Sequence, residues 1–126
     1  MSLKRVVIPT SDKNGLDAVP SEHFGRAPYF AVLEIGEKGS VSNIEFIQNT
    51  SEHFGGKGLP PDRIISLKPD ALITYGMGPR ALARFQEARV AVLKADDGKL
   101  VELVHGFSNN DLEELTEGCQ EAKHPY

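Results

Sequence analysis

Two copies of one pentapeptide carry the histidines through which this sequence could do chemistry. Residues 21–25 and 51–55 both read Ser-Glu-His-Phe-Gly, thirty positions apart. Imidazole is a borderline-soft ligand for transition metals, and two loops can present such groups to one centre. The alternative is coincidence, because Ser followed by Glu is typical of residues that begin a turn or a helix. We favour the first interpretation and take His23 and His53 as candidate metal ligands.

Glycines and arginines accompany the histidines. The glycines that we assign to a cofactor site are Gly55, Gly56, Gly58, Gly76 and Gly78. Glycine lets backbone N–H groups approach a ligand closely, and the start of a helix adds a partial positive charge. Arg26 and Arg80 would contribute positive charge, although surface ion pairs with Glu22 or Asp62 are an alternative role. Imidazoles, guanidinium groups and backbone N–H groups together suit an anionic metal centre.

Other side chains that could meet a ligand are weaker candidates. Cys119 and His124 lie five positions apart near the C-terminus, and both residue types bind metals. We take Cys119 as a third candidate metal ligand and interpret His124 as part of a tail without a fixed role. Met77 carries a thioether, but a buried packing role is the better interpretation. Phe24 and Phe54 are also expected to pack rather than to contact a ligand.

The elements that must position these residues follow from the apolar patterns. The sequence predicts strands at 6–10, 29–35, 41–47, 70–75 and 90–94. It predicts helices at 60–67, 79–87 and 109–117, and the segment 98–104 fits a helix better than a strand. This order is typical of an α/β domain with a mixed five-stranded sheet. The first, fourth and fifth strands should be parallel, while the second and third form an antiparallel hairpin.

This arrangement brings three loops together. The third strand returns antiparallel to the second, so the first and third strands point the same way. The loops that follow the first, third and fourth strands therefore leave the sheet at one edge, and they carry the histidines, the glycines and the arginines. Ligands of open α/β sheets bind at the carboxyl ends of strands, where the strand order reverses.

Composition narrows the class of protein. The 126 residues fit one domain, which we expect at residues 1–118, followed by a tail at 119–126. A net charge of −4 disfavours nucleic acid as a partner but still allows one local anion site. One cysteine excludes an internal disulfide and a multi-cysteine zinc site. The longest apolar run, residues 29–33, is too short for a membrane span, so we expect a cytoplasmic protein. We expect it to be a monomer or a dimer.

Three motifs resemble one known family. Residues 21–30, after a Val-Val-Ile-Pro-Thr strand, resemble the N-terminal signature of the dinitrogenase iron–molybdenum cofactor biosynthesis family. This family includes nitrogenase cofactor carriers and accessory proteins, and the orange protein that holds a molybdenum–copper–sulfide cluster. Residues 53–58 are similar to the family's His-Gly-Gly-rich loop, and residues 70–82 match its strand–Gly-x-Gly-Pro-Arg–helix element. The resemblance covers roughly residues 6–106.

The resemblance implies both a fold and a role. The fold is a ribonuclease-H-like, three-layer α/β/α arrangement with strand order 3-2-1-4-5. The role is non-catalytic binding, storage or delivery of an anionic metal–sulfur cofactor or precursor, of iron–molybdenum or molybdenum–sulfide type. A cofactor-receiving protein is then a possible partner. The family's histidine role would fall to His23 and His53, and such sparse ligation suits cargo that is released.

Two other functions compete with this one. A metal-dependent nuclease needs several carboxylates on the central strands, and the first, fourth and fifth predicted strands contain only Asp70. A sensor of small anions or phosphates would use the glycine loops and Arg80. The chain contains neither Gly-x-Gly-x-x-Gly after a strand nor a P-loop, so dinucleotides and nucleoside triphosphates are unsupported ligands.

Overall fold

Five strands form one mixed sheet in the computed structural model, which describes residues 3–22, 24, 26–49, 60–95 and 98–115. The strands are β1 (Lys4–Thr10), β2 (Tyr29–Ile35), β3 (Val41–Gln48), β4 (Ala71–Thr74) and β5 (Ala91–Lys94). They lie in the order β3-β2-β1-β4-β5, which confirms the order expected from the sequence.

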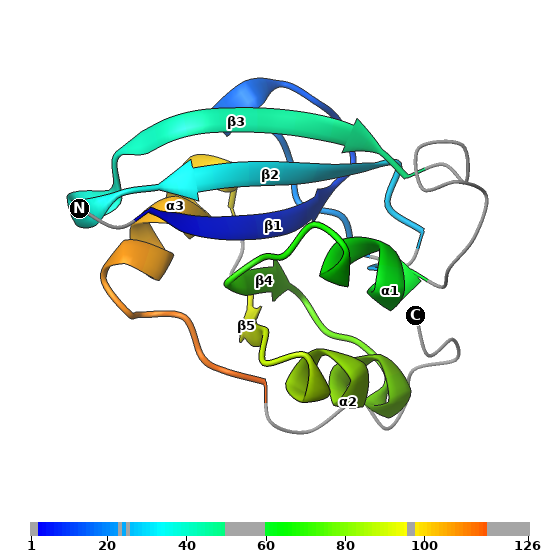
Figure 1. The fold of residues 1–126 in the computed structure, drawn as a ribbon. Helices are drawn as coiled ribbons and strands as arrows, with labels where there is room; N and C mark the ends of the chain where they lie inside the picture. Colours follow the sequence, from blue (N-terminus) through cyan, green and yellow to red (C-terminus); the bar gives the residue numbers. More distant parts are fainter. Residues whose placement is uncertain (1–2, 23, 25, 50–59, 96–97, 116–126) are drawn as a thin grey trace.

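The strand directions place the ends of four strands together. β1 is parallel to β4, β4 is parallel to β5, and β2 is antiparallel to both β1 and β3. Consequently β1, β3, β4 and β5 run the same way, and their carboxyl ends meet at the right-hand side of the sheet in Figure 1. We call this side the carboxyl edge. The loops that follow β1, β3 and β4 all leave the sheet there, as predicted.

Helices cover both faces of the sheet. α1 (Pro60–Ile65) and α2 (Pro79–Glu87) pack on one face, and α3 (Leu100–Ser108) packs on the other. Side chains of β1 alternate between the two layers, because Val7 joins the core beside α1 and α2 whereas Val6 and Ile8 join the core beside α3. The three-layer α/β/α arrangement is therefore confirmed, while the ribonuclease-H-like label stays a prediction.

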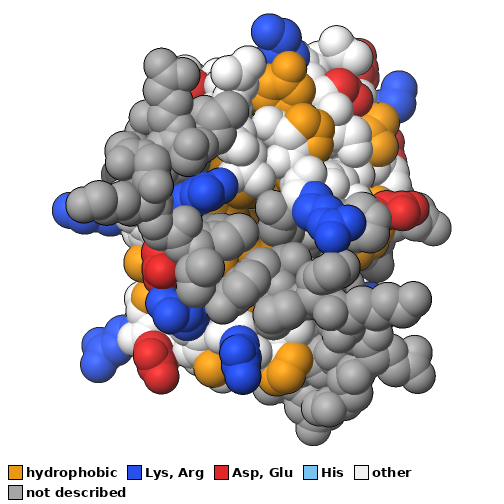
Figure 2. Space-filling view, turned by 90° about the vertical axis from the view of Figure 1, so that its right-hand side faces the viewer, with side chains coloured by type: hydrophobic (Ala, Val, Ile, Leu, Met, Phe, Trp, Pro, Cys, Tyr) orange, Lys and Arg blue, Asp and Glu red, His pale blue; other side chains and the backbone are white. Residues whose placement is uncertain are grey.

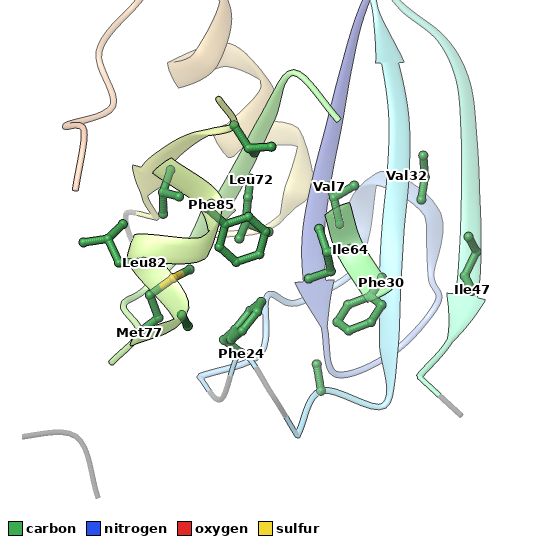
Figure 3. Packing of buried hydrophobic residues seen from close by; sticks show 14 residues of the cluster. Val7, Phe24, Phe30, Val32, Ile47, Ile64, Leu72, Met77, Leu82 and Phe85 are labelled. Carbon is green, nitrogen blue, oxygen red and sulfur yellow. The ribbon is translucent and has the colours of Figure 1, made fainter. Parts of the chain in front are cut away.

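Helix α2 has the bounds predicted from the sequence. Pro79 occupies its first position, where the missing N–H costs least. Ala81, Leu82 and Phe85 have helical spacing and are all buried against the sheet, as Figure 3 shows for the two larger side chains. Burial of this one face explains why so short a helix is stable.

Helices α2 and α3 end in the same way. After each cap comes a residue in the left-handed region, Arg89 with φ 61° and Asn110 with φ 58°. The next N–H then donates back across the last turn, as from Asp111 to the Gly106 carbonyl at 2.9 Å. These bonds satisfy carbonyls that would otherwise be left without donors at the helix ends.

The helix predicted over 109–117 is wrong for its described part, residues 109–115. This segment runs beside β5 instead, and the Leu115 N–H donates to the Val92 carbonyl at 2.8 Å. Leu112 and Leu115 have helical spacing, but they pack on opposite faces of the sheet. Residues three apart point to opposite sides of an extended chain, so both leucines are covered without a helix.

Other elements differ from the predictions only at their ends. β1 begins at Lys4 rather than at residue 6, α1 ends at Ile65 rather than at residue 67, and α3 replaces the predicted range 98–104. The proposed tail, 119–126, lies outside the described residues, so the domain division stays a prediction. Within the described part of the chain, every helix is too short or too polar to cross a membrane.

Candidate functional site

The loop after β1 is held to the sheet on both sides of its histidine. The Ser21 N–H donates to the Pro9 carbonyl at 2.8 Å, and Ser21 is itself buried. Phe24 and Ala27 are also buried, whereas Glu22 and Arg26 are exposed. The apolar residues of this loop therefore anchor it, and these two charged residues lie at the surface.

Phe24 ties this loop to helix α2. Its ring packs edge-on against Phe85, with ring centroids 5.7 Å apart and planes at 76°. Met77, just before α2, is 4% exposed and belongs to the same cluster (Figure 3). The packing interpretation is thus confirmed for Phe24 and Met77, and the loop after β1 is positioned beside the start of α2.

Asn49 joins the loop after β1 to the end of β3 and to α1. Its backbone N–H and side-chain amide donate to the carbonyls of Pro28 and Ala27, at 3.0 and 2.9 Å. Its side-chain oxygen accepts a hydrogen bond from Arg63 Nη1 at 2.8 Å. The sequence motifs do not single out this residue. The only signal was its type, because Asn directly after a strand often bonds to nearby backbone.

The turn after β4 leads into an uncapped helix. Gly78 is the residue before α2 and contributes no side-chain cap, and the first turn of α2 contains no acidic residue. A Cβ built at Gly76 would meet no atom within 4 Å, and its φ lies outside the left-handed region. Neither backbone strain nor crowding therefore requires glycine at position 76.

Arg80 lies exposed in the first turn of α2. The alternative role, a surface ion pair with Asp62, is not found, because the described partner of Asp62 is Arg84, at 2.7 Å. No hydrogen bond or ion pair joins Arg80 to another residue in the described ranges. Figure 2 views the carboxyl edge face on and shows Lys and Arg side chains near its centre. A guanidinium group is thus available beside the positive end of a helix.

Several predicted site residues lie outside the described residues. They are His23, His53, Gly55, Gly56, Gly58 and Cys119, together with His124 and Phe54. Their assignment as ligands stays a prediction. Among the described residues, no group of three or more His, Cys, Asp or Glu side chains could hold a metal ion. The structure does bring together the segments that flank the two histidine-bearing loops, at Pro28 and Asn49.

The carboxylate that a metal-dependent nuclease would need lies far from the carboxyl edge. Asp70 precedes β4, at the opposite edge of the sheet, and its carboxylate accepts a hydrogen bond from the Arg5 N–H at 2.8 Å. It therefore fastens β1 to β4. Strands β1, β4 and β5 themselves contain no carboxylate.

A pocket also lies at this opposite edge. It has a volume of about 250 Å³ and is lined by residues that include Lys4, Gly36, Lys38 and Asn110. The carboxyl end of α3 lies beside it, and the lining combines two lysines with Glu37. None of the predicted site residues lines this pocket.

One protein family and one curated relative match most of this chain. The family described as "Dinitrogenase iron-molybdenum cofactor" matches residues 4–110. The uncharacterized protein MJ0580 of Methanocaldococcus jannaschii is 31% identical over 117 residues, which cover 91% of this chain and 94% of the relative.

Solved structures of other proteins have the same fold. The crystal structure of PH0822 is 30% identical, with a TM-score of 0.71 and coverage of 89% of this chain and 96% of that chain. The apo form of the orange protein from Desulfovibrio gigas has a TM-score of 0.75 at 18% identity, covering 95% of this chain and 100% of that chain. The second likeness shows the fold alone.

Proposed function

Because the chain belongs to the dinitrogenase iron–molybdenum cofactor family, we propose that it binds an anionic metal–sulfur cofactor or a precursor of one. The cargo is of iron–molybdenum or molybdenum–sulfide type. The protein stores it or delivers it to a receiving protein and performs no catalysis on it. The binding site is the carboxyl edge, where the loops after β1, β3 and β4 meet.

The turn from Gly76 to Gly78 is the observation that carries this proposal. Packing and backbone conformation leave Gly76 free to be another residue, so a ligand that approaches the backbone closely explains the glycine. The uncapped start of α2 follows directly, and Arg80 adds a full positive charge there. An anion at this position would satisfy both the helix N-terminus and the guanidinium group.

The two histidines supply the metal-binding part of the proposal. His23 and His53 would ligate the metal of the cargo through imidazole nitrogen, with Cys119 as a third candidate. A site with so few ligands holds its cargo less firmly than a closed multi-cysteine site does. Reversible binding of this kind suits a carrier.

A second candidate function uses the same edge. The uncapped α2 and Arg80 would also bind a small anion such as phosphate, as a sensing or binding module does. The two functions differ in the need for imidazole, because phosphate binding depends on N–H groups and charge rather than on histidine.

Metal loading of histidine variants tests the proposal. Protein is reconstituted without oxygen with iron, molybdate and sulfide, passed through gel filtration, and analysed for metal content and visible absorption. We expect wild type to retain molybdenum and the double variant His23→Ala/His53→Ala to retain markedly less. His105→Ala is the matched control, because His105 is an exposed residue of α3 outside the site. Equal retention by the double variant would remove the histidines from the site.

A further inference from the structure

Thr74 carries a buried hydroxyl group without a hydrogen-bond partner. It is the last residue of β4, it is 2% exposed, and its Oγ1 makes no hydrogen bond among the described residues. The other buried strand threonine, Thr10, instead donates to the Asp12 carbonyl at 2.8 Å. An unpaired buried hydroxyl destabilises a protein, so a native structure that keeps one calls for an explanation.

A second buried donor lies just beyond it in the chain. Ala81, in the first turn of α2, is fully buried, yet no residue in the described ranges accepts a hydrogen bond from its N–H. The first bond of the helix runs from the Leu82 N–H to the Gly78 carbonyl, at 3.1 Å. The first N–H groups of any helix lack partners within it, but they are usually capped or solvated.

Both donors belong to the same side of the carboxyl edge. Strand alternation puts Thr74 on the face of Leu72, so its side chain points toward the layer that contains α1 and α2. Ala81 packs in that same layer. β4 also neighbours β1, and the connections from these two strands leave in opposite directions along the sheet, so Thr74 lies at the point where ligands of such sheets bind.

We propose that the Thr74 hydroxyl and the Ala81 N–H bind one corner of a small tetrahedral dianion. Arg80 would contact the remaining corners through its N–H and its guanidinium group, and the first turn of α2 holds no carboxylate that would repel the charge. This inference rests on the proposed function and names the precursor class, a molybdate or thiomolybdate. Phosphate and sulfate share the geometry and charge, so the probes must separate them.

Calorimetric titration of the full chain with four anions tests this subsite. The probes are molybdate, tetrathiomolybdate without oxygen, phosphate and sulfate, each added to wild type, Thr74→Val and Thr74→Ser. We expect wild type to bind at least one of the molybdenum anions. Thr74→Val should bind it about 10- to 100-fold more weakly, as a lost hydrogen bond to a charged ligand predicts. Thr74→Ser keeps the hydroxyl and should bind nearly as wild type does.

Urea unfolding shows whether a variant loses anion affinity because of the lost hydroxyl group or because it is less stable. Thr74→Val removes an unpaired hydroxyl, so without ligand it should resist urea at least as well as wild type does. Thr10→Val is the matched control. It loses the bond to Asp12 and should unfold at lower urea, but it should keep the anion affinity because Thr10 lies on the α3 face of the sheet.

The outcomes separate this inference from the proposed function. Equal affinities of wild type and Thr74→Val, or no anion binding by wild type, would overturn the subsite. Retention of metal–sulfur cargo by Thr74→Val would then leave the proposed function standing. A third outcome is that phosphate or sulfate binds in a way that depends on Thr74, while no molybdenum anion binds. The subsite for a tetrahedral dianion would then stand, but its assignment to molybdenum and the proposed molybdenum–sulfur cargo would both be wrong.

Discussion

At the residue scale, the roles of some side chains at the carboxyl edge can be predicted from the sequence and the roles of others cannot. Phe24 and Met77 are apolar residues beside apolar segments, and their packing role was predicted and confirmed. Asn49 and Thr74 were missed, because the state of each depends on hydrogen-bond partners that the fold brings together or withholds. Sequence spacing predicts which residues share a face, but it does not predict whether a given polar atom finds a partner.

Gly76→Ala separates ligand binding from folding. The added methyl group enters open space in a backbone conformation that alanine adopts, so the free energy of unfolding should change by less than about 0.5 kcal/mol. Binding of a molybdenum–sulfide anion should weaken, because the methyl group occupies the space through which the ligand approaches the backbone. Urea unfolding and calorimetric titration of the same preparation measure the two effects. Unchanged affinity would show that Gly76 lies outside the site.

At the element scale, helices were predicted correctly where the local sequence contained several helix signals. Helix α2 combines a proline at its first position with apolar residues on one face, and its bounds were predicted correctly. The segment 109–115 offered only two leucines at helical spacing. This segment forms two backbone hydrogen bonds with β5 and partly buries both leucines, so tertiary contacts determine its conformation.

Arg89→Gly should stabilise the protein. Arg89 adopts a φ of 61°, which costs a residue with a side chain about 1 kcal/mol and costs glycine little. Removing this strain should raise the free energy of unfolding by about that amount. Ala83→Gly, at an exposed position inside α2, is the control and should lower it by about 1 kcal/mol. Chemical denaturation measures both, and a loss of stability in Arg89→Gly would mean that the arginine side chain has a role of its own.

At the scale of the whole molecule, charge is distributed unevenly. The chain carries a net charge of −4, yet the carboxyl edge holds Arg26, Arg80 and the positive end of α2. The opposite edge also carries cations, because Lys4 and Lys38 line its pocket, but Glu37 and the carboxyl end of α3 lie beside them. The arrangement of strands and the common edge of three loops could be predicted from the sequence. Side-chain geometry at that edge could not, because it depends on contacts between segments far apart in the chain.

The most direct test of an anionic metal–sulfur ligand at the carboxyl edge is an amide NMR titration. Labelled protein is titrated without oxygen with a diamagnetic molybdenum–sulfide anion, and the shift of every backbone amide is recorded. We predict that the largest shifts fall at Arg26, Ala27, Asn49 and residues 75–81 other than Pro79, together with the two histidine-bearing loops, and that Lys4 and Gly36 stay unchanged. Largest shifts around the pocket at the opposite edge, or no shifts at millimolar anion, would contradict this account.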